Sequence, residues 1–444
     1  MRHGAPRSLR LVATGDLLLT QRLSRRPEPG FAEVVEEVRD AEVAVTNLEC
    51  PVFDGRGYPA AESGGIWPWA GAWAGEELGW FGVHLVGLAN NHMMDFGAGG
   101  LRATCESLAH AGLGHTGAGV HLGDARRPVY WDSPAGRVAM IAATATFPSH
   151  ARAGRQRPDF RGRPGVNPLR FSASYACSPE DLAALETLGQ HYHLGRGRMT
   201  IPGEEASPAS KREAWFGGVH LHVGPLGEVI SAANPDDLAG NLRSVQEAAR
   251  QADWVIVQVH SHESHPDPDG PAPFLTAFCH ACIDAGAHVV IGHGPHRTRA
   301  VEIHRNRPIL YSLGNFVMQN ETTPVLPADV YETFGFGDAA TPAEIFEARS
   351  DGDRRGFPAQ PLFWQTVLPA MTFGPGGLEE LTLRPLTLGR LQPRPRRGLP
   401  EPAQGAEADE ILGRVAGLSA SCGTTFRRDG GLLRWPPKGT SVQS

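Results

Sequence analysis

Three consecutive stretches decide the fold: WVIVQVH at residues 254–260, APFLTAFCHACIDAG at 272–286 and HVVIGH at 288–293. The first and the last are short apolar runs, which are typical of buried strands, and the middle one has the length and apolar spacing of a helix. A strand, a helix and a second strand in succession are typical of a sheet whose two faces are covered by helices. The sequence therefore predicts an α/β fold.

The same alternation is found on both sides of this stretch. Near the N-terminus, SLRLVATGD at 8–16 predicts a strand, and FAEVVEEVRD at 31–40 has apolar residues at helical spacing. Further elements are predicted at 41–49 (strand), 83–91 (strand), 101–112 (helix) and 308–316 (strand, PILYSLGNF). The α/β rhythm thus extends over most of the chain.

Two regions interrupt the alternation. Residues 148–225 are rich in Gly, Pro and Arg, with one predicted helix that begins after Ser178, a good N-cap. We interpret them as an insertion or lid rather than as a separate domain. Residues 391–444 begin with the linker-like LQPRPRRGLPEPAQG and continue with a short helix at 407–419. We therefore predict one domain, 1–390, followed by a C-terminal tail.

The composition argues against several classes of protein. With 41 Lys and Arg against 48 Asp and Glu, the formal net charge is −7, which disfavours nucleic acid as a partner. No apolar run follows the charged start MRHGAPRSLR, so we expect no signal peptide, no membrane anchor and a cytoplasmic location. The six cysteines are scattered and fit reduced thiols in a core. The sequence leaves the oligomeric state open.

Polar side chains stand at the carboxyl ends of the predicted strands. They are Asp16, Glu49, Asn91, His92, His260, His293 and His296. Ligands collect beyond the carboxyl ends of strands in such sheets, and carboxylate, carboxamide and imidazole groups together suit Zn²⁺, Mn²⁺ or Fe²⁺. Each residue alone is more often a turn or a hydrogen-bonded side chain. Their recurrence at successive strand ends predicts a site for one or two divalent transition-metal ions.

Several motifs occur in the order that is found in a known family. They are GD (15–16), NLECP (47–51), ANNHMMDFG (89–97), the strand-ending His260 followed by Glu263, GAHVVIGHGPHR (286–297) and ILYSLGNFV (309–317). Over about residues 9–319 the chain resembles the CapA family of poly-γ-glutamate biosynthesis proteins. The resemblance implies a calcineurin-like metallophosphoesterase fold, which is a four-layer α/β/β/α sandwich, here with an inserted Arg-, Gly- and Pro-rich lid segment.

The resemblance also implies roles for individual residues. One ion would be held by Glu49, Asn91, His260 and His293, and a second by Asp16, Glu49 and His296. His92 would act as a general acid or bind the anion of the substrate. Asp95 would share in catalysis by orienting the His92 ring, or it would cap the helix that follows, and the sequence leaves both roles open.

The sequence departs from the family pattern at the second ion. Metallophosphoesterases begin with Asp-x-His, whereas Leu18 stands two residues after Asp16, so this site lacks one imidazole. Two further histidines, His262 and His265, follow His260 closely. They either extend the site or face water, and we expect them to face water.

Arginine is concentrated in residues 151–170, where six arginines stand against a single acid, Asp159. Their forked guanidinium groups suit carboxylates and phosphates, so the segment predicts anion binding, and the alternative is a solvated loop. The residues that we expect to contact the substrate are Arg161, Arg163, Arg170, Glu263 and Arg297.

Two functions of different classes are compatible with these patterns. The first is a metal-dependent hydrolase or an acyl- or phosphoryl-transfer enzyme of poly-γ-glutamate or related amide biosynthesis. It would act at a phosphoester, acyl-phosphate or amide centre of a small anionic substrate or a γ-glutamyl chain. The second is a non-catalytic accessory subunit of a polymer synthesis or export complex, with a structural metal. The sequence contains neither a P-loop motif nor a GxSxG motif, so neither a P-loop ATP site nor a serine hydrolase is predicted.

Overall fold

The computed structural model describes residues 8–193, 213–216, 219–264 and 266–436. Strands and helices alternate along the chain, and most strands lie in two large sheets, one of ten strands and one of six. The prediction of an α/β fold is confirmed. Among the described residues, none of the helices has both the length and the hydropathy that a membrane crossing requires.

The larger sheet contains both ends of the described chain. In hydrogen-bonded order its strands are β21 (Arg427–Asp429), β22 (Leu432–Trp435), β19 (Gly377–Thr387), β18 (Gln365–Gly374), β1 (Leu9–Leu18), β2 (Val43–Leu48), β3 (Leu85–Gly87) and β4 (Gly114–Thr116); β17 (Asn315–Met318) pairs with β1, and β20 (Glu401–Pro402) with β19. The parallel strands β1, β2 and β3 bring their carboxyl ends to one edge of the sheet.

The smaller sheet has its own set of parallel strands. Its order is β15 (Val301–His304), β16 (Arg307–Leu310), β14 (Val289–His293), β13 (Trp254–His260), β7 (Gly136–Thr144) and β6 (Val129–Ser133). Strands β16, β14, β13 and β7 are parallel, so their carboxyl ends also share one edge.

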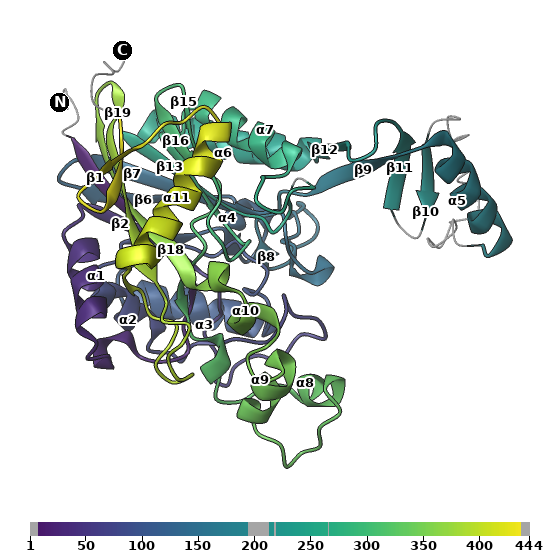
Figure 1. The fold of residues 1–444 in the computed structure, drawn as a ribbon, viewed down its shortest axis with the longest axis horizontal. Coiled ribbons are helices and arrows are strands. Elements are labelled where there is room, and N and C mark those ends of the chain that lie inside the picture. The colour runs from purple at the N-terminus through teal and green to yellow at the C-terminus, as the bar shows by residue number, and fades with distance from the viewer. Residues whose placement is uncertain (1–7, 194–212, 217–218, 265, 437–444) are drawn as a thin grey trace.

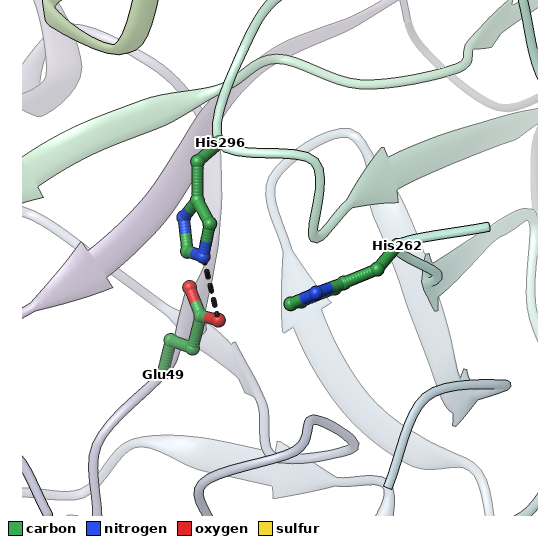
Figure 2. A group of neighbouring side chains, drawn as sticks. All are labelled: Glu49, His262 and His296. Carbon is green, nitrogen blue, oxygen red and sulfur yellow. Dashed lines mark ion pairs between the residues drawn. The ribbon is translucent and has the colours of Figure 1, made fainter. Parts of the chain in front are cut away.

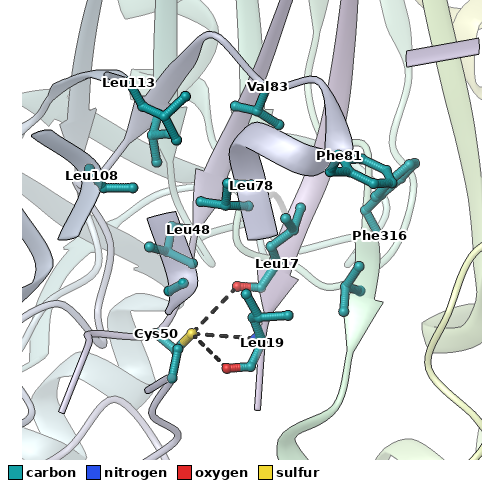
Figure 3. Close-up of a cluster of buried hydrophobic side chains, with 14 of the residues drawn as sticks. Leu17, Leu19, Leu48, Cys50, Leu78, Phe81, Val83, Leu108, Leu113 and Phe316 are labelled. Atoms are coloured by element: carbon teal, nitrogen blue, oxygen red, sulfur yellow. Dashed lines mark hydrogen bonds between the residues drawn. The ribbon is translucent and has the colours of Figure 1, made fainter. Parts of the chain in front are cut away.

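Helices cover one face of each sheet. The larger sheet carries α1 (Pro29–Arg39), α2 (Ala74–Phe81) and α3 (Gly97–His110), and the smaller sheet carries α6 (Pro235–Gln251) and α7 (Pro273–Asp284). In the cluster under α2, Phe81 packs edge-on against Phe316, and the thiol of Cys50 contacts the backbone of Leu17 and Leu19 (Figure 3). The apolar spacing that predicted these helices is the face that they bury.

A third buried cluster joins the two sheets. It contains Leu11 and Val45 from the larger sheet and Met140, Ile256 and Ile291 from the smaller one. Because each sheet is buried on both faces, its central strands are apolar throughout, which is the pattern that the sequence shows. The strand ends are thereby held in fixed positions relative to each other.

The residues predicted as a C-terminal tail are packed on this body. Helix α11 (Gly405–Ser421) contributes Ile411, Leu412 and Val415 to the cluster between the sheets. Strands β20 and β22 both pair with β19. The linker-like start of residues 391–444 is therefore followed by strands and a helix that complete the larger sheet.

Four strands and one helix extend away from the rest of the molecule (Figure 1). The strands pair in the order β10 (Glu213–Phe216), β11 (Val219–Val223), β9 (Phe171–Cys177) and β12 (Val229–Ala233), and α5 (Pro179–His191) lies beside them. The hydroxyl of Ser178 accepts a hydrogen bond from the backbone N–H of Asp181, so the predicted N-cap is confirmed. We call the described residues between 171 and 233 the arm.

Several short elements complete the chain. They are η1 (Leu23–Arg25), β5 (Ala118–Gly119), α4 (Leu122–Ala125), η2 (Ser149–Ala151), β8 (Gly165–Val166), η4 (Asn320–Thr322), α8 (Ala328–Thr333), α9 (Pro342–Ser350), α10 (Gly356–Ala359) and η5 (Pro361–Trp364). Helices α8 and α9 project at the lower side of the molecule in Figure 1. At the start of α9, Thr341 and Glu344 form a capping box.

The stretch 308–316, which we predicted to be one strand, is two. Its first half is β16 in the smaller sheet, and its end begins β17 in the larger sheet. Gly314 lies between them with φ of +75°, a conformation that favours glycine and lets the chain turn from one sheet to the other. The single-strand prediction was wrong because apolar residues on both sides of the turn belong to different cores.

Candidate metal centre

The carboxyl ends of four strands bring four predicted ligands together. Asp16 lies near the end of β1, Glu49 follows β2, His260 ends β13 and His293 ends β14. His260 and His293 are register partners in adjacent parallel strands. None of the four residues is more than 2% exposed. Both sheets therefore contribute to one buried polar centre.

Two overlapping triads of potential metal ligands form around Glu49. The first is Asp16, Glu49 and His260, the second is Glu49, His262 and His296, and in each triad one donor atom per residue lies within 4.8 Å of the others. Oε1 of Glu49 is 3.6 Å from Nε2 of His260 and 3.7 Å from Nε2 of His296. Figure 2 shows the second triad, with the Glu49 carboxylate facing the His296 ring. Glu49 belongs to both triads, which is the place of a bridging ligand.

His262 takes a place that the sequence did not give it. We expected it to face water, but its Nε2 lies 3.1 Å from Nε2 of His260 and its ring packs against that of His296. It supplies an imidazole near Leu18, which stands where the family pattern has a histidine. The grouping also places Asp16 with His260, whereas the resemblance assigned them to different ions.

Several buried atoms of this centre have no hydrogen-bond partner among the described residues. They are both carboxylate oxygens of Glu49, Oδ1 of Asn91 and Nε2 of His293. A buried polar atom without a partner costs about 1–3 kcal/mol, so native proteins rarely keep several in one place. All of these atoms are good ligands for a divalent transition metal, and one or two cations would satisfy them together. The residues present therefore fit a metal centre.

Asp16 is held from three sides. Nδ2 of Asn47 donates to its Oδ1 at 2.8 Å, the backbone N–H of Gly294 donates to its Oδ2 at 3.1 Å, and Nδ1 of His293 lies 3.0 Å from its Oδ1. Burial by itself would raise the pKa of this carboxyl group, but His293 and the neighbouring imidazoles outweigh burial, and the pKa is lowered. Asp16 is therefore a carboxylate at neutral pH, as a metal ligand must be.

Glu49 has the opposite electrostatic environment. Burial, together with the charges of Asp16 and Asp95, raises its pKa well above the ordinary value. Burial is also the main reason that the pKa values of the three imidazoles in the triads are lowered, that of His262 to about 3. Neutral imidazoles keep a lone pair for a metal ion, and a cation next to Glu49 would favour its carboxylate form.

Asn315 sets the tautomer of His296. Its Nδ2 donates to the backbone carbonyls of His296 and Phe363, at 3.3 and 2.9 Å, and its Oδ1 faces Nδ1 of His296 at 2.8 Å. An amide oxygen only accepts hydrogen bonds, so Nδ1 carries the proton and Nε2 keeps its lone pair. Such a partner on the second nitrogen is typical of metal-binding histidines.

The ring of His92 is held by Asp95. Nδ1 of His92 is 2.7 Å from Oδ2 of Asp95, which also accepts a hydrogen bond from the hydroxyl of Ser63 at 2.9 Å. Burial raises the pKa of Asp95, although His92 and Ser63 act against it. Asp95 does not cap α3, whose N-cap is Phe96. Of the two roles left open by the sequence, the geometry favours contact with His92.

A cavity of about 290 Å³ adjoins the second triad. Its polar lining residues are His92, His262, Ser264, His296, Arg297, Arg299, Asn320 and Arg349, and its apolar ones include Ile66, Phe357 and Phe363. Among the described residues that line it there is no aspartate or glutamate. The cavity presents imidazole and guanidinium groups to a ligand, which suits an anion.

Three arginines that we expected at the substrate do not line this cavity. Arg161 and Arg163 are exposed on the surface, and Arg163 donates to the backbone carbonyl of Arg152. Arg170 lies at the base of the arm, where its Nε donates to Oδ2 of Asp237 at 2.6 Å. The partner of Arg170 is thus a carboxylate of the protein itself.

Glu263 and Arg297, the other two residues expected at the substrate, differ in position. Arg297 lines the cavity. The carboxylate of Glu263 accepts hydrogen bonds from the hydroxyls of Thr146 and Ser261, at 2.9 and 2.6 Å, and does not line it. The Thr146 hydroxyl also accepts from the backbone N–H of His262 at 2.8 Å. Glu263 therefore supports the loop that presents His262.

The sequence analysis missed residues that were adjacent to predicted ones. Asn90 donates through Nδ2 to Oδ1 of Asn47 at 3.1 Å, and Asn47 in turn holds Asp16. Both asparagines stand inside the quoted motifs, so their position next to a ligand was the available signal. For His262 the signal was its spacing of two from His260, since alternate residues of an extended segment point to the same side. His265 lies outside the described residues.

Known proteins resemble this chain over much of its length. Residues 10–320 match the model of a family described as bacterial capsule synthesis protein PGA_cap. An uncharacterized protein of Sinorhizobium fredii is 33% identical over 96% of this chain and 92% of its own length. The capsule biosynthesis protein CapA of Bacillus anthracis is 26% identical over 54% of this chain and 42% of its own length. A probable polyglutamine synthesis accessory protein of Mycobacterium tuberculosis is 29% identical over 53% of this chain and 45% of its own length.

Proposed function

This chain belongs to the bacterial capsule synthesis protein family that includes CapA, and on that premise we propose that it is a metal-dependent enzyme. It would act as a hydrolase or as an acyl- or phosphoryl-transfer enzyme on a glutamate-like or phosphorylated substrate, in poly-γ-glutamate or related amide biosynthesis. The observation that carries the proposal is the set of unpartnered, buried ligand atoms around Glu49.

The donor set supports one or two divalent ions. The residues that would hold them are Asp16, Glu49, Asn91, His260, His262, His293 and His296. Nδ2 of Asn91 donates to the backbone carbonyl of Gly64 at 3.1 Å, which leaves its Oδ1 for an ion. When bound, a divalent transition metal such as Mn²⁺, Zn²⁺ or Fe²⁺ supplies a Lewis acid and lowers the pKa of water.

His92 is the group that we expect to hold and move a proton. Its Nδ1 faces Asp95, so Nε2 is the nitrogen available to a ligand in the cavity that His92 lines. From there it would donate a proton to the leaving group or a hydrogen bond to a developing negative charge. Asp95 would act as a positioning residue, since it fixes the orientation of the ring.

The substrate class follows from the cavity. The described lining residues offer guanidinium and imidazole groups and no carboxylate, which favours a molecule with at least one negative charge. The volume of about 290 Å³ is at the lower end of ligand cavities and suits a small molecule or the end of a γ-glutamyl chain. The names of the Bacillus and Mycobacterium relatives, which refer to capsule and polyglutamine synthesis, agree with an amide-polymer pathway.

We also propose the finer architecture. The two facing sheets and their covering helices would be the four layers of the metallophosphoesterase sandwich, and the three buried clusters support this. Residues 1–390, with 148–225 as an insertion or lid, would form most of the core domain, and 391–444 would be a C-terminal extension whose strands and helix pack into the same core. A cytoplasmic location stays a prediction.

Elemental analysis of the purified protein tests the metal, and assays with p-nitrophenyl phosphate and γ-glutamyl peptides test the activity. We expect bound Mn, Zn or Fe in the wild type and its loss in Glu49→Gln. His92→Ala should keep the metal and the fold but lose activity, because it removes only the proton donor. The exposed residue His150, mutated to Ala, is the matched control and should change nothing.

The alternative, a non-catalytic accessory subunit with a structural metal, makes a different prediction. In that case the wild type binds metal but turns over none of the substrates, and His92→Ala is silent in every assay. A wild-type protein without any bound transition metal, and without stabilisation by added metal, would contradict both functions.

A further inference from the structure

The cavity next to the metal centre is built from two parts of the chain. His92, His262, His296 and Arg297 lie within residues 10–320, which match the family model. A second set of lining residues comes from the segment after residue 320 and consists of Arg349, Phe357 and Phe363. This segment contains α8, α9 and α10. One wall of the cavity therefore lies outside the part that defines the family.

Arg349, near the end of α9, makes no hydrogen bond or ion pair with any residue in the described part of the chain, and its side chain is exposed. The other two arginines of the cavity are engaged. Arg299 is buried and donates to the backbone carbonyls of Glu263 and Pro268, at 2.9 and 3.3 Å. Arg297 lies 3.5 Å from a carboxylate oxygen of Asp269. Arg297 and Arg299 each keep only a buried Nε without a partner, whereas the whole guanidinium of Arg349 remains for a ligand.

Acidic residues around α9 do not neutralise this free guanidinium, because they already have arginine partners. Arg397 pairs with Glu321 and with Asp353, each at 2.6 Å. Arg394 pairs with Glu347 at 2.6 Å. The pairs fix the surroundings of α9. Glu321 attracts Arg349 without forming an ion pair with it and is already held by Arg397, so the Arg349 guanidinium keeps its hydrogen-bond donors next to the cavity.

Asn320 provides an independent observation at the same wall. It lines the cavity, is only 7% exposed, and its Oδ1 is buried without a hydrogen-bond partner among the described residues. A buried amide oxygen of this kind is costly unless a donor, such as an N–H or O–H of a ligand, satisfies it. An amide can donate to an oxyanion and accept from an N–H of the same molecule. Asn320 and Arg349 both also line the small adjoining cavity of about 120 Å³.

We propose that Arg349 and Asn320 form a subsite for an oxyanion, carboxylate or phosphate, that lies away from the reacting centre of the substrate. The inference rests on the proposed function, because it takes the triads as the place of reaction. Arg349 supplies the charge and the paired donors, Asn320 adds a hydrogen bond, and Phe357 and Phe363 close the apolar side. Substrate specificity would then reside in Asn320, at the end of the family-matched part, and in the segment that follows it, while the chemistry resides in the family-matched part.

The test measures binding rather than turnover. Inorganic phosphate and γ-L-glutamyl-L-glutamate are titrated calorimetrically into the metal-loaded wild type, Arg349→Gln, Arg349→Lys and Arg354→Gln. Arg354 is the matched control, since it is exposed, pairs with Asp351 and does not line the cavity. We expect Arg349→Gln to weaken binding about 10- to 100-fold, Arg349→Lys to lose less, and the control to bind like the wild type. The probe whose affinity is lower in Arg349→Gln than in the wild type shows whether the subsite binds a phosphate or a carboxylate.

Two outcomes would overturn the subsite. One is that Arg349→Gln binds both probes as tightly as the wild type, and the other is that the wild type binds neither probe at millimolar concentration. Elemental analysis accompanies each variant and should show unchanged metal content. If binding depends on Arg349 but no turnover of any substrate is found, the proposed function fails and the subsite stands. If turnover is found and its KM is unaffected by Arg349→Gln, the subsite fails and the function stands.

Discussion

Glu49 is the residue at which stability and chemistry oppose each other. It is fully buried between Asp16 and the imidazoles, its two oxygens have no hydrogen-bond partner among the described residues, and its pKa is raised by burial. A metal ion would stabilise the carboxylate, but without metal the same group costs free energy at neutral pH. A metal site needs Glu49 ionised, and in the metal-free protein the ionised form of Glu49 is therefore less stable than the protonated form.

Glu49→Gln should separate these two effects. The amide has the same shape and no charge. We therefore expect the free energy of unfolding of the metal-free variant to exceed that of the metal-free wild type by about 1–3 kcal/mol. The same variant should no longer gain stability when metal is added, because the shared ligand is gone. Thermal and urea unfolding with a chelator and with added Mn²⁺ measure both effects. A variant that is less stable than the wild type in the chelator would contradict the argument.

Asn315 should affect metal affinity through His296. Because its Oδ1 accepts from Nδ1 of His296, Asn315→Leu should allow the ring to rotate or change tautomer and should lower the metal affinity about 10- to 100-fold. Asn315→Asp keeps an acceptor at this position and should lose less. Competition with a metal-binding dye measures the affinity. Equal affinities of the Leu variant and the wild type would show that His296 is not a ligand.

The buried imidazoles predict how stability changes with pH. The pKa values of His260, His262 and His296 are lowered by burial, so below about pH 6.5 the unfolded chain takes up protons that the folded chain refuses. The free energy of unfolding of the metal-free protein should therefore fall as the pH decreases from about 6.5, and for His262 this continues to about pH 3. The raised pKa values of Glu49 and Asp95 act in the opposite direction but involve two protons against the three of these imidazoles.

Urea unfolding at several pH values checks this prediction. In His262→Gln one of the refused protons is removed, so the slope of the unfolding free energy against pH should decrease by about 1.4 kcal/mol per pH unit well below pH 6.5. The exposed His150→Gln is the control and should leave the slope unchanged. A metal-free wild type whose stability rises on acidification through this range would contradict neutral, buried imidazoles.

At the residue scale, the sequence predicted which side chains meet but not all of their partners. Asp16, Glu49, His260 and His293 could be placed because apolar runs mark where strands end, and parallel strands end together. The position of Arg170 could not be predicted, because its partner Asp237 is 67 positions away in α6, a helix that covers the smaller sheet, and no local pattern encodes that pairing. Side chains in loops take their direction from such distant contacts.

At the scale of elements, β1 and the β16–β17 turn depend on each other. A Cβ at Gly15 would lie 2.0 Å from the backbone oxygen of Gly314, and the N–H of Asp16 donates to that same oxygen at 2.9 Å. The two segments can approach this closely only because Gly15 has no side chain. The close approach fixes Asp16 at the edge shared by the two sheets.

Gly15→Ala should therefore destabilise the protein by about 1–3 kcal/mol or more and weaken metal binding, because the backbone that carries Asp16 must move. The matched control is Gly79→Ala in α2, where the nearest atom to a new Cβ is 4.0 Å away. That change should be neutral or stabilise the protein by roughly 0.5–1 kcal/mol through helix propensity. Urea unfolding and elemental analysis of both variants give the comparison. If the two alanines have the same effect, the close contact does not matter.

Elements with strong apolar periodicity could be predicted well, and those that depend on tertiary contacts could not. Strand β13 begins and ends at the predicted residues, and α1 buries the predicted face. Strand β1 continues to Leu18, past the predicted end at Asp16, because Leu17 and Leu18 pair with β17. The last two residues of the strand depend on this pairing with β17, which no local sequence pattern reveals.

At the scale of the whole molecule, the α/β class could be predicted, whereas the arm could not. Its strands are only partly buried and carry exposed apolar residues such as Tyr175 and Ile230. The alternation of apolar and polar residues in β11 (VHLHV) was the available signal, and an interpretation based on composition did not use it. The composition of 148–225 showed an interruption but not its shape. The arm itself leaves the body at Phe171 and returns at Ala233.

The geometry at the base of the arm allows it to be removed. Phe171 and Ala233 are register partners in the antiparallel pair β9–β12, as are Ser172 and Ala232. The ring of Phe171 stacks on that of Phe274 in α7 with centroids 4.3 Å apart, so the base is anchored in the body. Replacing residues 173–231 by Asn-Gly should close Ser172 and Ala232 with a two-residue hairpin turn.

The shortened protein should fold and bind as much metal as the full chain, because all described candidate ligands and the buried members of the three clusters lie outside the deleted residues 173–231. Circular dichroism, urea unfolding and elemental analysis measure this. As a control, Asp237→Asn in the full chain breaks the pairing with Arg170 at the base and should destabilise the protein without loss of metal. An excised protein that aggregates or lacks metal would show that the arm belongs to the core domain rather than to an insertion. The argument for an inserted segment would then fail at the level of the whole fold.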